Sequence, residues 1–177
     1  MKRPFPLSKV YSLLESGPVI MVSTAYKGRN NVMTMSWHTM IDFNPPLVGC
    51  VISDRNYTFG LVKKTRQCVI SIPTLEIAKT AVACGNVSGR KTDKFAAFGL
   101  TPVKAAQVGA PLIKECYANL ECELADARLS GKYNLFIFKV VKAWVDTSKK
   151  HPKTIHHRGG EEFMVSGPTI KISSKMA

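Results

Sequence analysis

The chain has 177 residues, 45% of them hydrophobic and 8% aromatic, and its 25 lysines and arginines against 12 aspartates and glutamates give a formal net charge of +13. This composition excludes a disordered polar chain and predicts a single domain with a substantial core. The sequence has no run approaching the roughly 20 apolar residues of a membrane-spanning helix, and Pro4, Pro6 and Lys9 interrupt the region where a signal peptide would be apolar. We therefore expect a cytoplasmic protein.

The chain has five cysteines, an odd number, and no two of them have C-x-x-C spacing. A disulfide scaffold and a zinc site are therefore not expected. The cysteines are predicted to be buried reduced thiols, and they are Cys50, Cys68, Cys84, Cys116 and Cys122.

The positive charge indicates an anionic partner, for which nucleic acid and a phosphorylated cofactor are the two candidates. The basic residues are scattered from Lys2 to Lys175, without a long basic tail and without the aromatic-glycine signature of an RNA-binding strand. Most of these charges are therefore expected on solvated surface.

Turn and cap residues divide the chain into short elements. The first expected elements are a helix from Ser8 to Gly17, a strand over 19–25, a turn over 27–30, a strand that starts at Asn31 and is broken by Pro45 and Pro46, and a strand over 47–53. Further along they are a short helix capped by Thr58, a strand over 68–73, a helix from Thr74 to Gly85, a short helix capped by Thr92, a strand over 118–124 and a long strand or strand pair over 133–145. Strands and helices do not alternate strictly, so the pattern predicts a mainly antiparallel barrel with helices packed on it.

The strand that starts at Asn31 mixes polar and large apolar side chains. If it alternates regularly, one face carries Asn31, Met33, Met35 and Trp37, and the other carries Val32, Thr34, Ser36 and His38. A planar heteroaromatic ligand along such a strand would bond to its backbone and hydroxyl groups, with tryptophan or methionine against its faces. A barrel strand with one wet face explains the pattern equally well. His38 is either a proton donor or an ordinary polar strand residue.

Segment 53–60 follows a strand and opens a helix. Ser53, Arg55 and Thr58 supply two hydroxyls and a guanidinium there, where the free N–H groups of the helix also point. This combination suits a phosphate. The alternative is that Thr58 only caps the helix and Arg55 lies on the surface.

Segment 84–100 joins a glycine- and serine-rich turn, which contains Ser88, to a short helix. It is not a Walker loop, because Arg90 occupies the second glycine position of that motif. Lys94 lies in the first turn of the helix, where its charge opposes the helix dipole. A bound anion would explain Lys94, and a solvated lysine is the simpler alternative.

The motifs of hydrolases and Rossmann enzymes are missing from the sequence, and no pair of carboxylates stands out. His156 and His157 lack a third metal ligand at useful spacing and are predicted on the surface. Any catalysis is therefore expected from a bound cofactor, with no metal, and no side chain is assigned a catalytic role.

Taken in order, five segments resemble the flavin reductase-like, FMN-binding split-barrel family, and its flavoredoxin branch in particular. They are residues 31–49, 52–73, 84–102, 110–124 and 133–145, so the resemblance extends over residues 17–146. It implies a mainly β fold, a six-stranded antiparallel Greek-key split barrel with short flanking helices, in a single domain over 1–177 with a C-terminal tail from residue 147. It also implies a homodimer with FMN near the subunit interface.

The resemblance further implies where the cofactor lies. The flavin ring would lie against the strand from Asn31 to Trp37, and the phosphate would lie with Ser53, Arg55 and Thr58. The implied cofactor-binding residues are Asn31, Met33, Thr34, Met35, Ser36, Trp37, Ser53, Arg55, Thr58, Ser88 and Lys94. In the tail, Phe163 and the turn at Ser166 and Gly167 are expected to matter most.

Family members either reduce flavin with NADH or NADPH or pass electrons between redox proteins. The resemblance thus implies an FMN-dependent oxidoreductase whose partner is a pyridine nucleotide or a redox protein. Two alternatives stay open. One is a basic barrel that binds nucleic acid, and the other is a flavin-binding protein without catalysis.

Overall fold

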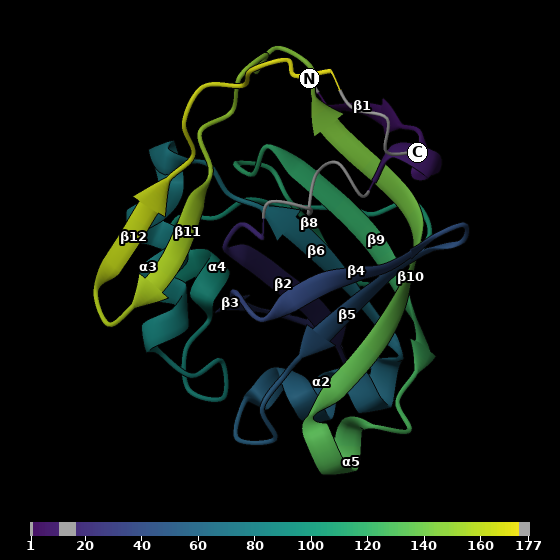
Figure 1. Cartoon of the computed structure of the whole chain (residues 1–177). Helices are drawn as coiled ribbons and strands as arrows, with labels where there is room; N and C mark the ends of the chain where they lie inside the picture. The colour runs from purple at the N-terminus through teal and green to yellow at the C-terminus, as the bar shows by residue number, and fades with distance from the viewer. Residues whose placement is uncertain (1, 11–16, 174–177) are drawn as a thin grey trace.

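The structure is a computed structural model in which residues 2–10 and 17–173 are described. Its body is an eight-stranded antiparallel sheet that curls into a barrel without closing (Figure 1). The strands run in the order β3-β2-β6-β9-β10-β5-β4, and β1 pairs with β10. They are β1 (Lys2–Phe5), β2 (Ile20–Tyr26), β3 (Arg29–Met35), β4 (His38–Phe43), β5 (Pro46–Val51), β6 (Gln67–Ile72), β9 (Ala118–Asp126) and β10 (Leu135–Asp146). The predicted split barrel is confirmed, with eight strands in its sheet where six were expected, and β3 and β4 are the two ends of that sheet.

Short helices and two small sheets flank the barrel. The helices are η1 (Leu7–Lys9), α2 (Tyr57–Thr65), η2 (Leu75–Ile77), α3 (Ala78–Asn86), α4 (Lys94–Ala97) and α5 (Ser130–Tyr133). One small sheet pairs β7 (Pro102–Val103) with β8 (Leu112–Ile113), and the other pairs β11 (Ile155–Gly159) with β12 (Glu162–Val165). Most of the helix expected from Ser8 to Gly17 lies outside the described residues.

The β2–β3 hairpin forms where the sequence predicted it. Residues 27 and 28 make its turn, with positive φ angles of 49° at Lys27 and 75° at Gly28. Glycine carries no Cβ and adopts this left-handed backbone without a steric cost. The hairpin matters for function because it makes β3 an edge strand of the sheet.

The prediction of one strand from Asn31 to the proline pair is wrong, because the chain turns at Ser36 and Trp37. The N–H of His38 bonds back to the carbonyl of Ser36 at 3.2 Å, and β4 then pairs with β5 instead of continuing β3. His38 is held in place here, because its Nε2 lies 2.6 Å from the carbonyl oxygen of Pro18. Burial lowers the pKa of His38 below its usual value.

Both predicted threonine caps are also wrong. The cap residue of α2 is Asn56, and Thr58 lies inside the first turn. The cap of α4 is Asp93, whose Oδ1 accepts hydrogen bonds from the N–H groups of Phe95 and Ala96 at 3.1 and 3.2 Å. Aspartate accepts such bonds as well as threonine does, so the helix begins one residue later than expected.

Side chains of β3 separate two regions of the core. Met33 and Met35 belong to the barrel interior, whereas Val32 packs with Ala81 of α3 and Phe95 of α4. The five cysteines are buried free thiols, as predicted. Burial raises the pKa of the Cys50, Cys68, Cys84 and Cys116 thiols, to about 11 at Cys84, which keeps these four protonated and inert at neutral pH.

Thr74, just before η2, carries a buried hydroxyl that has no hydrogen-bond partner among the described residues. A buried hydroxyl without a partner costs about 1–3 kcal/mol. Thr74→Val keeps the shape and removes this cost, so the free energy of unfolding should rise by about 1 kcal/mol. Urea unfolding of the two proteins measures the difference. A variant less stable than wild type would show that the Thr74 hydroxyl is satisfied.

Candidate functional site

Two adjoining cavities lie along β3 and share the residues Thr34, Gly85 and Asn86. The smaller, about 260 Å³, lies at the start of α2 and is called the helix cavity. The larger, about 560 Å³, lies beneath the β11–β12 hairpin and is called the hairpin cavity. Because the two adjoin, one elongated molecule with two chemically different ends can occupy both.

The helix cavity is polar and is built from four segments far apart in the sequence. Its lining comes from β3, from the start of α2, from the end of α3 with the loop after it, and from α4. The lining residues are Asn31, Met33, Thr34, Arg55, Asn56, Tyr57, Thr58, Gly85, Asn86, Val87, Ser88, Gly89 and Lys94. Seven of the eleven residues predicted to bind the cofactor are brought together here.

Lys94 is the buried cation of the helix cavity, with 4% of its surface exposed. Its Nζ extends away from α4 and donates to the carbonyl of Cys84 at 2.5 Å. That carbonyl lies in the last turn of α3, where a helix favours positive charge. The position of Lys94 in the first turn of its own helix is thereby explained without an anion. Burial lowers the pKa of Lys94 below its usual value, although the nearby Cys84 thiol partly offsets the effect.

Asn31 and Thr58 form a buried polar contact at the base of the helix cavity. The amide Nδ2 of Asn31 donates to the hydroxyl of Thr58 at 2.9 Å and to that of Thr24 at 3.4 Å. Both Asn31 and Thr58 are almost fully buried. This contact joins β3 to the first turn of α2, so the strand and the helix keep a fixed relative position.

Three arginines line the helix cavity or contact residues that line it. Arg55 lines it directly, and its backbone N–H bonds to the hydroxyl of Ser53 at 3.3 Å. Arg29 donates to the carbonyl of Gly89 at 3.0 Å. Arg90 lies over the ring of Tyr57, 5.3 Å from its centroid. The lining therefore combines the buried ammonium of Lys94 with the guanidinium of Arg55, and Arg29 and Arg90 contact the lining residues Gly89 and Tyr57.

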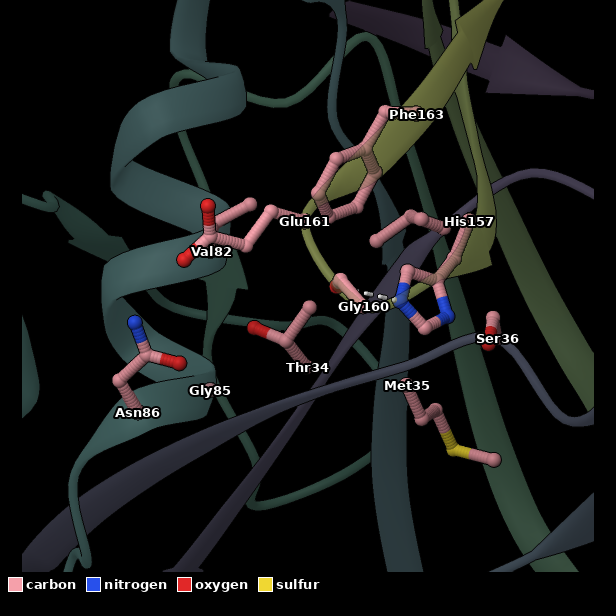
Figure 2. A pocket seen from close by; sticks show the side chains of 11 residues that line it. Thr34, Met35, Ser36, Val82, Gly85, Asn86, His157, Gly160, Glu161 and Phe163 are labelled. Carbon is pink, nitrogen blue, oxygen red and sulfur yellow. Dashed lines mark hydrogen bonds between the residues drawn. The ribbon is translucent and has the colours of Figure 1, made fainter.

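The hairpin cavity has a strand edge on one side and the C-terminal hairpin on the other. Figure 2 shows Thr34 between the α3 side chains of Val82 and Asn86 and the hairpin side chains of Phe163 and His157. The lining residues are Val19, Thr34, Met35, Ser36, Val82, Gly85, Asn86, His157, Gly160, Glu161 and Phe163. The hydroxyl of Thr34 donates to the carbonyl of Ala81 at 2.5 Å, which fixes β3 against α3.

The hairpin itself is organised by a cross-strand aromatic pair. The rings of His157 and Phe163 lie 5.2 Å apart, and Nε2 of His157 is 3.2 Å from the carbonyl oxygen of Gly160. His156 points elsewhere: it is buried, not on the surface as predicted, and its Nε2 lies 3.0 Å from the hydroxyl of Thr154. Ser166 anchors the end of β12, because its Oγ accepts from the N–H of Thr154 at 2.9 Å.

Two of the predicted residues line neither cavity. The hydroxyl of Ser53 accepts a hydrogen bond from the backbone N–H of Arg55 in the same turn. Trp37 follows the end of β3 and is 71% exposed. Several lining residues carried no signal that separates them from ordinary loop residues, above all Asn86, Gly89 and His157. Glycine-containing turns on either side of them were the nearest indication. The placement of these three depends on α3 and the hairpin folding back onto β3.

The described residues contain no group of three or more histidine, cysteine, aspartate or glutamate side chains able to hold a metal ion. No helix in the ranges 2–10 and 17–173 is long and apolar enough to cross a membrane.

Comparison with known proteins identifies the family. The model of the flavin reductase like domain matches residues 13–162. An uncharacterized protein of Archaeoglobus fulgidus is 37% identical over 111 residues, which span 63% of this chain and 63% of that protein.

Two solved structures share the fold. One is the FMN-binding domain of a flavin reductases-like enzyme from Shewanella baltica, with 26% identity, a TM-score of 0.91 and coverage of 98% of each chain. The other is the flavoredoxin of Desulfovibrio vulgaris, with 24% identity, a TM-score of 0.81 and coverage of 90% of this chain and 91% of that one. The resemblance noted in the sequence is confirmed, and the chain belongs to the flavin reductase-like domain family.

Proposed function

We propose that the protein binds FMN and acts as a flavin-dependent oxidoreductase, with the phosphate in the helix cavity and the ring in the hairpin cavity. The observation that carries this proposal is the pairing of the two cavities. The helix cavity is lined by the cations Lys94 and Arg55. The adjoining hairpin cavity is flanked by the edge strand β3 and by the aromatic side chain of Phe163. FMN is an elongated molecule with these two kinds of end.

The residues present fit a phosphate ester in the helix cavity. Lys94 and Arg55 supply positive charge, Thr58 and Ser88 supply hydroxyls, and the first turn of α2 adds free N–H groups. Charge-assisted hydrogen bonds of this kind are about twice as strong as neutral ones. The phosphate would therefore be the main anchor of the cofactor.

The residues along β3 fit the ring. Because β3 is an edge strand, its outer backbone N–H and C=O groups have no strand partner and are available to a ligand. Thr34, Met35 and Ser36 would lie along one side of the ring, and Phe163 would lie on the hairpin side. The edge position also explains why candidates from both faces of the strand border the site.

A bound FMN would supply the hydride- and electron-accepting ring that no side chain provides. The work of the chain is then to bind, orient and shield, and a general acid–base pair is not required. We propose either NADH or NADPH as the hydride donor or a redox protein as the electron partner, the latter in the manner of an electron carrier.

We also propose a homodimer with the flavin near its interface. The exposure of Trp37, together with exposed Ile41 and Phe43 on the edge strand β4, supports a contact surface there. Trp37 would then contact the partner subunit instead of the cavities of its own chain. Light scattering of the purified protein should give twice the chain mass, and a monomer would contradict the proposed dimer.

The direct test of the proposed function is flavin content. Purified protein should show a visible flavin absorption band, and flavin-free protein should regain it when FMN is added. Bleaching by NADH or NADPH alone supports a reductase, whereas bleaching only by a reduced ferredoxin-like protein supports a carrier. Protein that has no flavin band and does not take up FMN would contradict the proposal.

Arg55→Ala tests the phosphate position. Removing a charge-assisted contact should weaken FMN binding by about 1.5–3 kcal/mol, near the lower limit because Arg55 is exposed. Titration of the flavin-free protein with FMN measures the effect. Arg128→Ala is the matched control, since Arg128 is an exposed arginine that pairs with Asp126 and lines neither cavity. Equal FMN affinity in both variants would remove Arg55 from the site.

A further inference from the structure

The contact between Asn31 and Thr58 has a direction. A side-chain amide nitrogen only donates, so the Thr58 oxygen must be the acceptor in the 2.9 Å bond from Asn31 Nδ2. A threonine hydroxyl accepts through its oxygen and donates through a single hydrogen. With the oxygen engaged by Asn31, that hydrogen points away from the amide and is free to donate.

The hydrogen of Thr58 has no acceptor among the described residues. Among the described residues, Asn31 is the single side-chain or backbone hydrogen-bond partner recorded for the Thr58 oxygen. Thr58 is 1% exposed, and the space that it borders is the helix cavity. A buried hydroxyl hydrogen is costly to leave unpaired. The cavity is thus the place where an acceptor for this hydrogen belongs.

Gly89 leaves room for the Asn31 amide. A Cβ atom added to Gly89 would lie 1.8 Å from Asn31 Oδ1, so the amide oxygen occupies the space that any other residue would fill. Arg29 holds the same loop by donating to the Gly89 carbonyl at 3.0 Å. On its other side the amide nitrogen reaches Thr24 as well as Thr58. The amide oxygen thus packs against the loop at Gly89, and the amide nitrogen faces both threonines.

We propose that Asn31 is a positioning residue that sets the polarity of the Thr58 hydroxyl, so that Thr58 donates to a phosphate monoester in the helix cavity. The inference rests on the proposed function. It goes further because it attributes part of the preference for FMN over riboflavin to Asn31, which acts by orienting the Thr58 hydroxyl. An oxygen acceptor on a dianion completes the bonding of Thr58, and a ligand without the phosphate leaves it incomplete.

The experiment compares the dissociation constants of FMN and riboflavin in single and double variants. Thr58→Val should raise the constant for FMN about tenfold, the usual worth of a hydrogen bond to a charged group, and leave that for riboflavin unchanged. Thr58→Ser keeps the hydroxyl and should restore the preference for FMN. Thr74→Val makes the same change at a buried threonine outside both cavities and should leave both constants unchanged.

Asn31→Asp tests the polarity itself. A carboxylate only accepts, so Thr58 would donate to it and turn its hydrogen away from the cavity. The added negative charge also repels a phosphate, and the Thr58→Val background separates the two effects because it has no hydroxyl to turn. The loss of FMN affinity on Asn31→Asp should be several-fold larger with Thr58 present than in the Thr58→Val background.

The outcomes separate this inference from the proposed function. If the wild type prefers FMN and Thr58→Val keeps that preference, the inference is overturned while the proposed function stands. An effect of Asn31→Asp that is equal in the two backgrounds also overturns it. A wild type that binds neither flavin overturns the proposed function and this inference with it. Should the Asn31 variant fail to fold, the Thr58→Val and Thr58→Ser pair still tests whether the Thr58 hydroxyl donates to the phosphate, and an unchanged preference for FMN in Thr58→Val overturns the inference.

Discussion

Replacing Lys94 by methionine should weaken FMN binding strongly and at the same time stabilise the flavin-free protein. Methionine has a similar length and no charge. Removing one partner of a buried charged pair costs about 2–5 kcal/mol, or at least about thirtyfold in the dissociation constant. In the flavin-free protein, by contrast, the buried ammonium has one acceptor in the part of the chain that the structure describes, the Cys84 carbonyl, and its burial is costly. The free energy of unfolding should therefore rise by about 1 kcal/mol.

The stability difference at Lys94 should depend on pH. Burial lowers the pKa of Lys94 from its usual 10.5, so the unfolded chain binds this proton more tightly than the folded one. The destabilisation is complete below the lowered pKa and fades as the pH rises toward 10.5. The advantage of Lys94→Met should thus be largest at neutral pH and shrink in alkali.

Urea unfolding with and without FMN, at neutral and alkaline pH, measures both effects of Lys94→Met. Lys91→Met is the matched control, because Lys91 belongs to the same segment but is exposed and lines neither cavity. Its stability should stay within about 0.5 kcal/mol of wild type. If Lys94→Met lowered the stability of the flavin-free protein, the Cys84 contact would outweigh the cost of burial. If it left FMN affinity unchanged, the phosphate would lie elsewhere.

Gly89→Ala should damage the same site by sterics alone. The backbone of Gly89 has no positive φ, so alanine adopts it without strain, but its Cβ would collide with the oxygen of Asn31. Either the loop or the amide must move, at a cost of about 1–3 kcal/mol in stability. Movement of the amide also releases Thr58, so the dissociation constant for FMN should rise about tenfold or more.

Gly60→Ala is the control for Gly89→Ala. Gly60 lies inside α2, and an added Cβ there meets nothing within 4 Å. Alanine in a helix interior is better than glycine by about 0.5–1 kcal/mol, so this variant should gain stability and keep its FMN affinity. Thermal unfolding and flavin titration of both variants give the comparison. A Gly89→Ala protein as stable as wild type would show that the loop moves aside freely.

The sequence predicted those elements whose signals are local. The β2–β3 hairpin has a turn glycine between two apolar runs, and the strand over 118–124 alternates cleanly, so both were found. The break at Ser36 and Trp37 was missed because no glycine or proline marks it. It arises from a distant partner, since β4 can pair with β5 only if the chain turns there.

The site was predictable to a similar extent. Arg55, Thr58 and Lys94 have the chemistry of anion ligands, and the structure brings all three into one cavity. The hydrogen bond from Asn31 to Thr58 was not predictable, because the partner of Asn31 depends on how α2 packs against β3. The contribution of the β11–β12 hairpin to the hairpin cavity was likewise not predictable, since the sequence of β11 and β12 does not indicate which surface of the barrel they cover. The residue types thus indicate which side chains can bind an anion, whereas the contacts between those side chains are known only from the fold.

The β11–β12 hairpin forms its own two-stranded sheet, separate from the barrel, and backbone bonds such as that from Val19 N–H to the Ile155 carbonyl at 2.8 Å attach it. Opening a small peripheral unit of this kind costs far less free energy than unfolding a barrel. A ring held beneath it would be released at the rate at which the hairpin lifts. A rapidly lifting hairpin gives a short residence time and suits an enzyme that hands reduced flavin to solution. A slowly lifting one keeps the flavin through many turnovers, as an electron carrier requires.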